Sequence, residues 1–247
     1  MLGILLAVFL MTAVYAADRE KNHPEATFYN GNTFYEEGRY DEAIQKYSIL
    51  LEQGYESGNL YFNIGNCYFK KGKLGKAIVN YERARRLIPR DNDLKENVKF
   101  AHSKIKYRAA DSSSWKKRIW KKFDLFTINE ITLILAGIYT AAILYLIVNL
   151  FFQKARRYRV IILAVSMVVF VLFSISLYYK ASVIGSEAVI ISEKAGVRFE
   201  PIHSATIYFT LYEGMKLYVI ETKTNWAKIR RQDGKTGWIE QKDMEVI

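Results

Sequence analysis

The sequence predicts a multidomain membrane protein with an all-α repeat region, a two-helix transmembrane hairpin and a C-terminal all-β barrel. The stretch GNTFYEEGRYDEAIQKY at residues 31–47 recurs in altered form at residues 65–81, a period of 34 residues. Two long apolar runs follow, joined by a short basic link, and short alternating strands come after them. A fixed repeat, spanning-length apolar runs and period-two alternation each indicate a different class of structure.

Each copy of the repeat is predicted to fold as two helices that turn at Gly38 or at Gly72. Small residues at the matched positions let the helices approach closely, and aromatic residues fill the space beside them. The matched pairs are Gly31/Gly65, Asn32/Asn66, Phe34/Tyr68, Ala43/Ala77, Ile44/Ile78 and Tyr47/Tyr81. Because one such helix pair cannot bury its apolar face alone, the copies are expected to stack.

Spacing and residue types together resemble the tetratricopeptide repeat, with copies at residues 24–57 and 58–91. The second copy carries the family's pattern at Tyr61, Gly65, Tyr68, Gly72, Ala77, Tyr81, Ala84 and Pro89. The first copy departs from it at Thr27, Asn30, Leu50 and Tyr55. A further helix at residues 92–108 is expected to cap the stack, which completes a repeat domain at residues 17–110.

The first helix of each pair should line a concave face, where the family commonly binds peptides. A spacing of i, i+4, i+7 and i+11 gathers a row of asparagines on that face. Asparagine is unfavourable inside a helix, so a row of asparagines on one face suggests a binding role. A side-chain amide can both donate hydrogen bonds to a peptide backbone and accept them from it. We predict a peptide-binding groove at Tyr29, Asn32, Asn63, Asn66 and Asn97. The alternative is that these asparagines are solvated surface residues.

The apolar run at residues 1–16 is predicted to be a cleaved signal peptide. It is short for a membrane span and ends in Val14-Tyr15-Ala16, with small residues at the positions that a signal peptidase reads. A retained anchor is the alternative, and both interpretations send the following residues across the membrane.

The two later apolar runs predict transmembrane helices at residues 127–152 and 160–179. The link at residues 153–159 is basic, with Lys154, Arg156, Arg157 and Arg159. The positive-inside tendency places that link in the cytoplasm. Residues 111–126 read as a basic amphipathic segment in the headgroup layer, or else as an ordinary basic flank. We therefore expect a two-pass protein of a bacterial inner membrane with both domains in the periplasm.

The net charge of +11 gathers partly around these apolar runs, so membrane lipids are expected partners and nucleic acid is not. The two repeats differ in charge. Residues 24–57 hold two basic and seven acidic residues, which gives −5, and residues 58–91 hold eight and two, which gives +6. This change of sign could orient a bound peptide, or it could be a solvated mixture of charges.

Residues 183–247 alternate in short predicted strands separated by turns, of which Asp233-Gly234 is a strong hairpin signal. The Trp226-Ala227-Lys228-Ile229 strand and the Gly234–Ile239 hairpin resemble a bacterial SH3 domain. That resemblance implies a small barrel that holds wall peptides or partner segments. Trp226 and Trp238 are either an aromatic ligand groove or partly buried core.

The sequence offers no catalytic site. It has one cysteine, Cys67, and three scattered histidines, so an internal disulfide is impossible and the histidines show no metal-ligand spacing. We expect no cofactor, no metal and no enzymatic activity. Cys67 lies within a repeat helix and is expected to be a packing residue, the alternative being a reactive thiol.

The order of signal peptide, repeats, hairpin and SH3-like domain resembles the E component family of the Bacteroides aerotolerance (Bat) operon. That family implies von Willebrand A-domain membrane proteins and a MoxR-type ATPase as neighbours, with a role in envelope or oxidative stress. The resulting prediction is a membrane-anchored periplasmic scaffold that binds protein partners. The alternative is a cell-wall sensor whose SH3-like domain binds peptidoglycan peptides.

Overall fold

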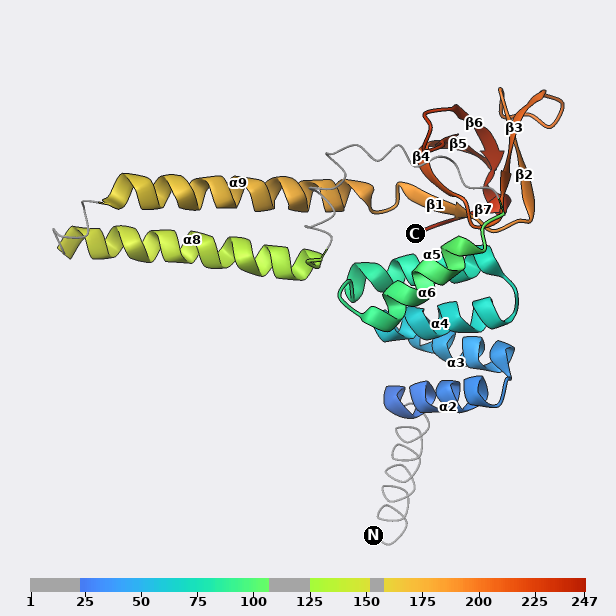
Figure 1. Cartoon of the computed structure of the whole chain (residues 1–247), viewed down its shortest axis with the longest axis horizontal. Helices are drawn as coiled ribbons and strands as arrows, with labels where there is room; N and C mark the ends of the chain where they lie inside the picture. The colour runs from blue at the N-terminus through green and yellow to red at the C-terminus, as the bar shows by residue number, and fades with distance from the viewer. Residues whose placement is uncertain (1–22, 107–124, 152–157) are drawn as a thin grey trace, which may run out of the picture.

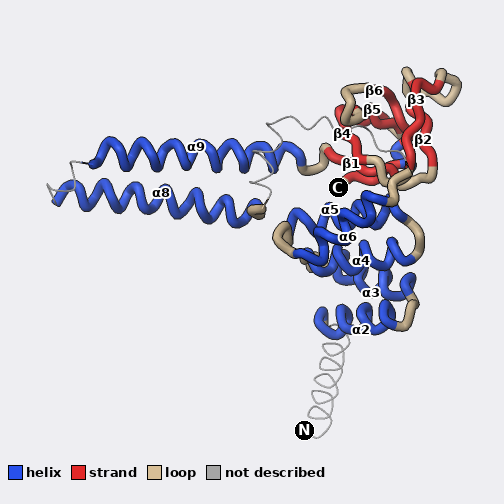
Figure 2. Tube along the Cα trace, viewed as in Figure 1, coloured by secondary structure: helices blue, strands red, loops and turns tan. Residues whose placement is uncertain are grey.

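The computed structural model describes residues 23–106, 125–151 and 158–247. These residues form a helical repeat domain, a long helical hairpin and a C-terminal sheet (Figure 1). Figure 2 shows the strands gathered in the C-terminal domain, while the repeat domain and the hairpin are helical. The predicted signal peptide at residues 1–16, most of segment 111–126 and most of link 153–159 lie outside the described residues.

Five helices of the described chain build the repeat domain. They are α2 (Pro24–Glu36), α3 (Tyr40–Glu52), α4 (Gly58–Lys70), α5 (Leu74–Leu87) and α6 (Asn92–Ser103). Side-chain caps mark where α4 and α6 begin: the Ser57 hydroxyl accepts a hydrogen bond from the Leu60 amide at 3.1 Å, and the Asp91 carboxylate accepts one from the Leu94 amide at 2.7 Å. The predicted pairs of helices and the capping helix are therefore present.

The helices of each repeat pack through the glycine and tyrosine that the period matches. A Cβ atom added at Gly31 would lie 2.4 Å from Tyr47 Cε1, and one added at Gly65 would lie 2.6 Å from Tyr81 Cδ1. Both tyrosine rings are fully buried by this contact. The close approach expected from the sequence is confirmed, because no larger residue than glycine fits beside either ring.

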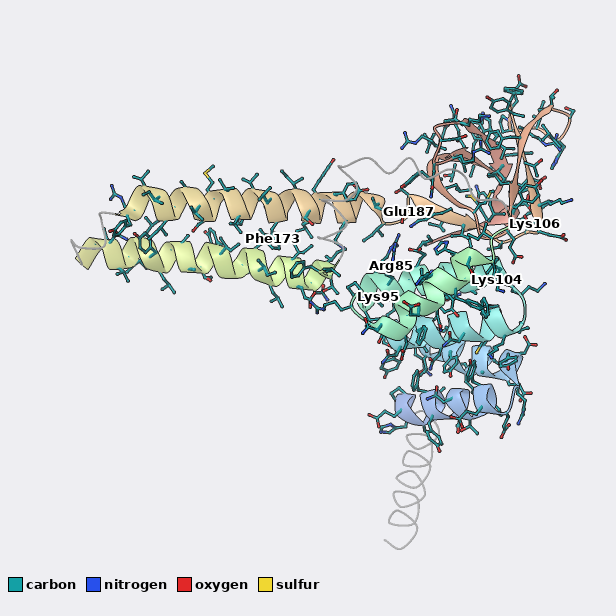
Figure 3. All side chains as sticks on the ribbon, in the orientation of Figure 1. Arg85, Lys95, Lys104, Lys106, Phe173 and Glu187 are labelled. Atoms are coloured by element: carbon teal, nitrogen blue, oxygen red, sulfur yellow. The ribbon has the colours of Figure 1, made fainter. Side chains whose placement is uncertain are left out.

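The hairpin consists of α8 (Ile128–Phe151) and α9 (Arg159–Val183), which lie side by side (Figure 1). Both helices are long and apolar enough to cross a membrane, by length and composition. Phe126 and Phe173, the latter labelled in Figure 3, join the two at one end with ring centroids 5.9 Å apart. At the start of α8, Thr127 and Glu130 form a reciprocal capping box, and Arg90 from the repeat domain pairs with Glu130.

The C-terminal domain is an antiparallel sheet of seven strands. They are β1 (Glu187–Ile190), β2 (Lys194–Arg198), β3 (Ile207–Tyr212), β4 (Lys216–Lys223), β5 (Trp226–Arg230), β6 (Thr236–Glu240) and β7 (Met244–Val246). The strand order is β3-β2-β6-β5-β4-β1-β7, so β3 and β7 are the two edges. The SH3-like class is confirmed, but the closed barrel is corrected to an open sheet. The sequence also missed β7, which the short 3₁₀ helix η2 (Gln241–Asp243) turns back onto β1.

The β1–β7 edge of the sheet packs directly on α5, the last helix of the second repeat (Figure 1). Val189 and Ile247 belong to the same buried cluster as Ile78 and Leu94 of the repeats. The approach is close at Gly75, where an added Cβ atom would lie 2.3 Å from the backbone oxygen of Ile190. The sheet thus covers the end of the repeat stack beside α6, where a further repeat would otherwise be needed to bury the apolar surface.

Ion pairs cross the same boundary. Lys216 of β4 lies between two carboxylates, with its Nζ 2.8 Å from Glu187 Oε2 and 3.5 Å from Glu82 Oε2. Glu82 comes from α5, and its side chain is only 5% exposed. Two further side chains contact the Glu82 carboxylate. Arg85 Nη2 lies 2.6 Å from Glu82 Oε2, and His102 Nε2 lies 3.4 Å from Glu82 Oε1. Figure 3 shows the labelled Arg85 and Glu187 on the facing sides of the two domains.

Burial raises the pKa of Glu82, but the nearby Lys216, Arg85 and His102 outweigh it and hold that pKa well below its ordinary value. A second set of bonds anchors β7: Arg83 pairs with Glu245 at 2.9 Å, and Arg86 donates to the Ile247 carbonyl at 2.7 Å. The two domains therefore form one unit through both apolar and charged contacts.

Glu82→Gln is expected to lower the free energy of unfolding by about 1.5–3 kcal/mol at neutral pH, because a charged, bonded acceptor is lost. The pKa of Glu82 is depressed in the folded state, so its contribution is present above the ordinary glutamate pKa of about 4.3 and is lost as the pH falls below it. The stability difference between wild type and variant should therefore shrink below about pH 4.

Denaturant unfolding followed by tryptophan fluorescence and circular dichroism measures this difference. Glu96→Gln is the matched control, since Glu96 is exposed on α6 and, among the described residues, forms an ion pair with its neighbour Lys99 alone. Equal stability of the Glu82 and Glu96 variants across the pH range would contradict a structural role for the ion cluster.

Candidate functional site

The predicted groove asparagines lie together on the face made by α2, α4 and α6. Asn32 Oδ1 accepts two hydrogen bonds, from the Tyr47 hydroxyl at 2.7 Å and from Asn63 Nδ2 at 3.0 Å. The second repeat reproduces the arrangement, with Asn66 Oδ1 accepting from Tyr81 at 2.8 Å and from Asn97 at 2.9 Å. Each triad joins the two helices of one repeat to the first helix of the next.

In these triads the asparagine side chains are partly engaged by the protein itself. The oxygens of Asn32 and Asn66 are used within the protein. Burial raises the pKa of both Tyr47 and Tyr81, so their hydroxyls remain donors to those oxygens at all ordinary pH values. Sequence reasoning assigned these tyrosines to space filling and missed their polar role, although their period of 34 matches that of the asparagines.

Half of each amide has no hydrogen-bond partner among the described residues. In the described part of the chain, Asn32 Nδ2 and Asn66 Nδ2 have no protein acceptor, and the Oδ1 atoms of Asn63 and Asn97 have no protein donor. Donors and acceptors thus alternate along the groove, which suits the alternating groups of an extended backbone. Tyr29, the fifth predicted residue, is 70% exposed on α2 beside them.

The far end of the groove, on α6, carries an exposed aromatic residue. Phe100 is 52% exposed and its ring centroid lies 5.5 Å from that of Phe69 on α4. Lys104 Nζ sits 4.9 Å from the Phe100 ring centroid. This end therefore offers apolar and cationic contacts, in contrast to the acidic first repeat.

Trp226 and Trp238 lie on the sheet face opposite the core. Directly paired residues of antiparallel strands share a face, and Lys228 pairs with Trp238 while Ala227 pairs with Ile239. Ala227 and Ile239 belong to the hydrophobic cluster on one face of the sheet, and the two tryptophans lie on the other face. Trp226 is nevertheless buried, as expected for a partly buried tryptophan, whereas Trp238 is half-buried, so the two have to be considered separately.

The two tryptophans differ in accessibility. Trp226 is only 7% exposed, and its ring lies 5.3 Å from the ring of His203 in the β2–β3 loop. Trp238 is half-buried, with Lys228 Nζ 5.9 Å from its ring centroid and Arg198 paired across the strands. Trp238 is thus the more accessible of the two for a ligand on this face.

Cys67 packs inside the repeat domain and is fully buried. Burial raises the pKa of its thiol to about 12, so the thiol is neutral and unreactive under ordinary conditions. This supports the packing role expected from its position. Within residues 23–106, 125–151 and 158–247, no group of three His, Cys, Asp or Glu side chains is placed to hold a metal ion.

Comparisons with protein families agree with this geometry. Residues 58–91 match the tetratricopeptide repeat, residues 31–72 match a second model described as TPR repeat, and residues 193–245 match the bacterial SH3 domain. Both modules are typically non-catalytic and bind other proteins. The chain therefore contains tetratricopeptide repeats, two helices of membrane-spanning length and a bacterial SH3 domain.

The chain is also similar to the human protein O-mannosyl-transferase TMTC1. The two are 32% identical over 117 residues, a stretch that covers 39% of this chain and 13% of the human protein. Because the chain spans so small a part of that relative's length, the similarity does not bring the transferase activity with it.

Asn66→Ala is expected to destabilise the repeat domain by about 1–3 kcal/mol, because it leaves the Tyr81 hydroxyl and the Asn97 amide without their acceptor. The gain in helix propensity from alanine, at most about 0.7 kcal/mol, is too small to offset this loss. The measurement is urea unfolding followed by circular dichroism.

Asn59→Ala serves as the control, since Asn59 is exposed on the same helix. A double-mutant cycle with Tyr81→Phe should show coupling between the two sites. If the free-energy changes of Asn66→Ala and Tyr81→Phe simply added in the double variant, or if Asn66→Ala stabilised the protein, a structural role for the triad would be ruled out.

Proposed function

We propose that the protein is a membrane-anchored scaffold that holds two protein-binding modules together at one end of a transmembrane hairpin. The observation behind this proposal is that the repeat domain and the SH3-like sheet pack against each other. The repeat domain and the sheet share a buried cluster and an ion network, while the groove face of α2, α4 and α6 and the outer face of the sheet remain open. Partners bound to the two faces would be held in a fixed relation to each other.

The cellular setting belongs to the same proposal. A periplasmic position follows from the predicted signal peptide and the basic link, and the resemblance to the Bat E component favours an envelope stress complex. Von Willebrand A-domain membrane proteins are then the expected partners of the groove, which offers alternating donors and acceptors to an extended segment. The chain itself would act by binding and not by catalysis.

A second candidate function is a cell-wall sensor, favoured by the outer face of the sheet. Trp238 lies there with Lys228 and Arg198, and none of the described acidic residues forms an ion pair with either cation. Arg198 donates to the Ala205 carbonyl and still carries its charge, and an aromatic ring beside two cations suits the carboxylates of peptidoglycan peptides. The two functions predict different captured material, so one experiment distinguishes them.

Crosslinking of the full-length protein in its native membrane is expected to capture von Willebrand A-domain proteins. Phe100→Ala should reduce this capture about fivefold, the equivalent of an aromatic contact of about 1 kcal/mol. Lys99→Ala, an exposed neighbour on the same helix, is the control. Undiminished capture by Phe100→Ala would argue against the groove, and muropeptides recovered instead of proteins would favour the sensor.

Topology can be tested with single cysteines and a membrane-impermeant maleimide. Gln232→Cys and Lys99→Cys, both at exposed positions, should be labelled from outside intact spheroplasts, whereas Ala155→Cys in the link should need permeabilisation. The native Cys67 provides a low background because it is buried. Labelling of residues 99 and 232 from opposite sides would refute the two-span hairpin.

A further inference from the structure

A cavity of about 650 Å³ opens at the N-terminal end of the groove. It lies between the first turns of α2, the α3–α4 turn and the start of α4. Its lining includes two carboxylates and three aromatic rings: Glu25, Glu56, Phe28, Tyr29 and Tyr55. We call it the Gly54 pocket, after the glycine at its rim.

The repeat itself explains why the pocket exists. Counting 34 residues forward, Gly54 corresponds to Ile88 and Pro24 corresponds to Gly58. In the second repeat, Ile88 fills the space, since a Cβ atom added at Gly58 would lie 2.5 Å from Ile88 Cγ1. The first repeat has no side chain at the equivalent place, so the volume that Ile88 occupies in one repeat is open in the other.

The end of α3 keeps this space open. Gly54 has φ +84°, a left-handed conformation that glycine adopts without strain, and the next amide, that of Tyr55, donates to the Leu50 carbonyl at 2.9 Å. The second repeat instead ends at Ile88-Pro89, which directs the isoleucine side chain inward.

The charge of the pocket is also particular to the first repeat. Glu25 and Glu56 correspond to Asn59 and Arg90 in the second repeat. Glu56 is oriented by the Tyr61 hydroxyl, which donates to its Oε1 at 2.8 Å. Among the described residues, no lysine or arginine pairs with either carboxylate, and only His23 approaches Glu25, at 3.6 Å. Two carboxylates therefore line the pocket without a lysine or arginine partner in the described chain, and the Glu25 side chain is 88% exposed.

The aromatic rings supply the second element of recognition. Tyr29 is 70% exposed and Tyr55 is 50% exposed, so two ring faces border the carboxylates. A cation is attracted both by a carboxylate and by the face of an aromatic ring, and the aliphatic stem of lysine or arginine packs well on such rings. The net charge of −5 over residues 24–57 adds a long-range attraction for cations.

We propose that the Gly54 pocket binds the side chain of a lysine or arginine in a peptide that lies extended in the groove. This proposal rests on the peptide-binding function proposed above and specifies the chemistry of the bound segment. The asparagine row binds any backbone, whereas the pocket selects a cationic residue at the end of the segment that contacts α2.

The test uses the full-length protein in non-ionic detergent micelles and three acetylated, amidated pentapeptides: Ala-Ala-Arg-Ala-Ala and its norleucine and glutamate counterparts. Binding is measured by saturation-transfer NMR and by titration. The arginine peptide should bind at least tenfold more tightly than the norleucine peptide, and more weakly as salt is raised. Norleucine has an unbranched aliphatic stem without the charge, so the ratio isolates the cation.

The double variant Glu25→Gln, Glu56→Gln should reduce the preference for arginine to less than twofold, while helicity by circular dichroism stays unchanged. Glu36→Gln is the matched control, since it removes one charge from an exposed position of α2 outside the pocket. A preference that persists in the double variant, or equal binding of the arginine and norleucine peptides by the wild type, would overturn the pocket. Partner capture by the Phe100→Ala chain reports on the groove separately, so the two proposals can fail independently.

Discussion

The buried carboxylate of Glu82 is the point on which the architecture depends. A charged group inside a protein is tolerated only when cations surround it, and one of the cations here, Lys216, comes from the other domain. Docking the sheet on α5 therefore satisfies a charge that the repeat domain cannot satisfy as well by itself. The same contact buries Val189 and Ile247 against the last repeat and so closes the exposed end of the stack.

The helical hairpin, whose two helices are long and apolar enough to cross a membrane, fits this arrangement of the two domains. The α9 helix runs almost directly into β1, whose Glu187 belongs to the ion cluster, and Arg90 at the end of the second repeat pairs with Glu130 at the start of α8. The start of α8 and the end of α9 are therefore both held next to the two packed domains. Domains that touch must lie on the same side of the membrane, and two spans are the smallest number after the repeats that returns the chain to that side.

Much of this fold could be predicted from the sequence, because the deciding signals are local. The period of 34 and the paired Gly31/Gly65 and Tyr47/Tyr81 positions predicted the helix pairs, and the apolar runs predicted α8 and α9. What the sequence missed depends on contacts between distant segments. β7 is three residues long and pairs with β1, which lies far earlier in the chain, and the sheet stays open with β3 and β7 as its edges.

The candidate site could be predicted only in part, because part of it depends on contacts between helices that are distant in the sequence. Helical spacing correctly brought Asn32, Asn63, Asn66 and Asn97 to one face, but it could not show that two of their oxygens are held by tyrosine hydroxyls from the neighbouring helix. Nor could it place Trp226 and Trp238 relative to the core, because strand alternation gives two faces without saying which is buried. The cavity at Gly54 was not predicted, because only the packing of Ile88 on Gly58 in the second repeat shows which space the first repeat leaves unfilled.

The sheet's position on α5 also restricts how such a protein can change in length over evolution. A repeat duplicated between α5 and the hairpin would have to carry equivalents of Gly75, Glu82 and Arg86 in its own second helix. Without them, the sheet could not pack on that helix as it packs on α5. A unit added ahead of Gly58 would meet no such demand, because its neighbours need only the glycine–tyrosine contact and the asparagine triad. Related chains with longer arrays should therefore have grown at the amino-terminal side, and their last repeat should be the one that changes least.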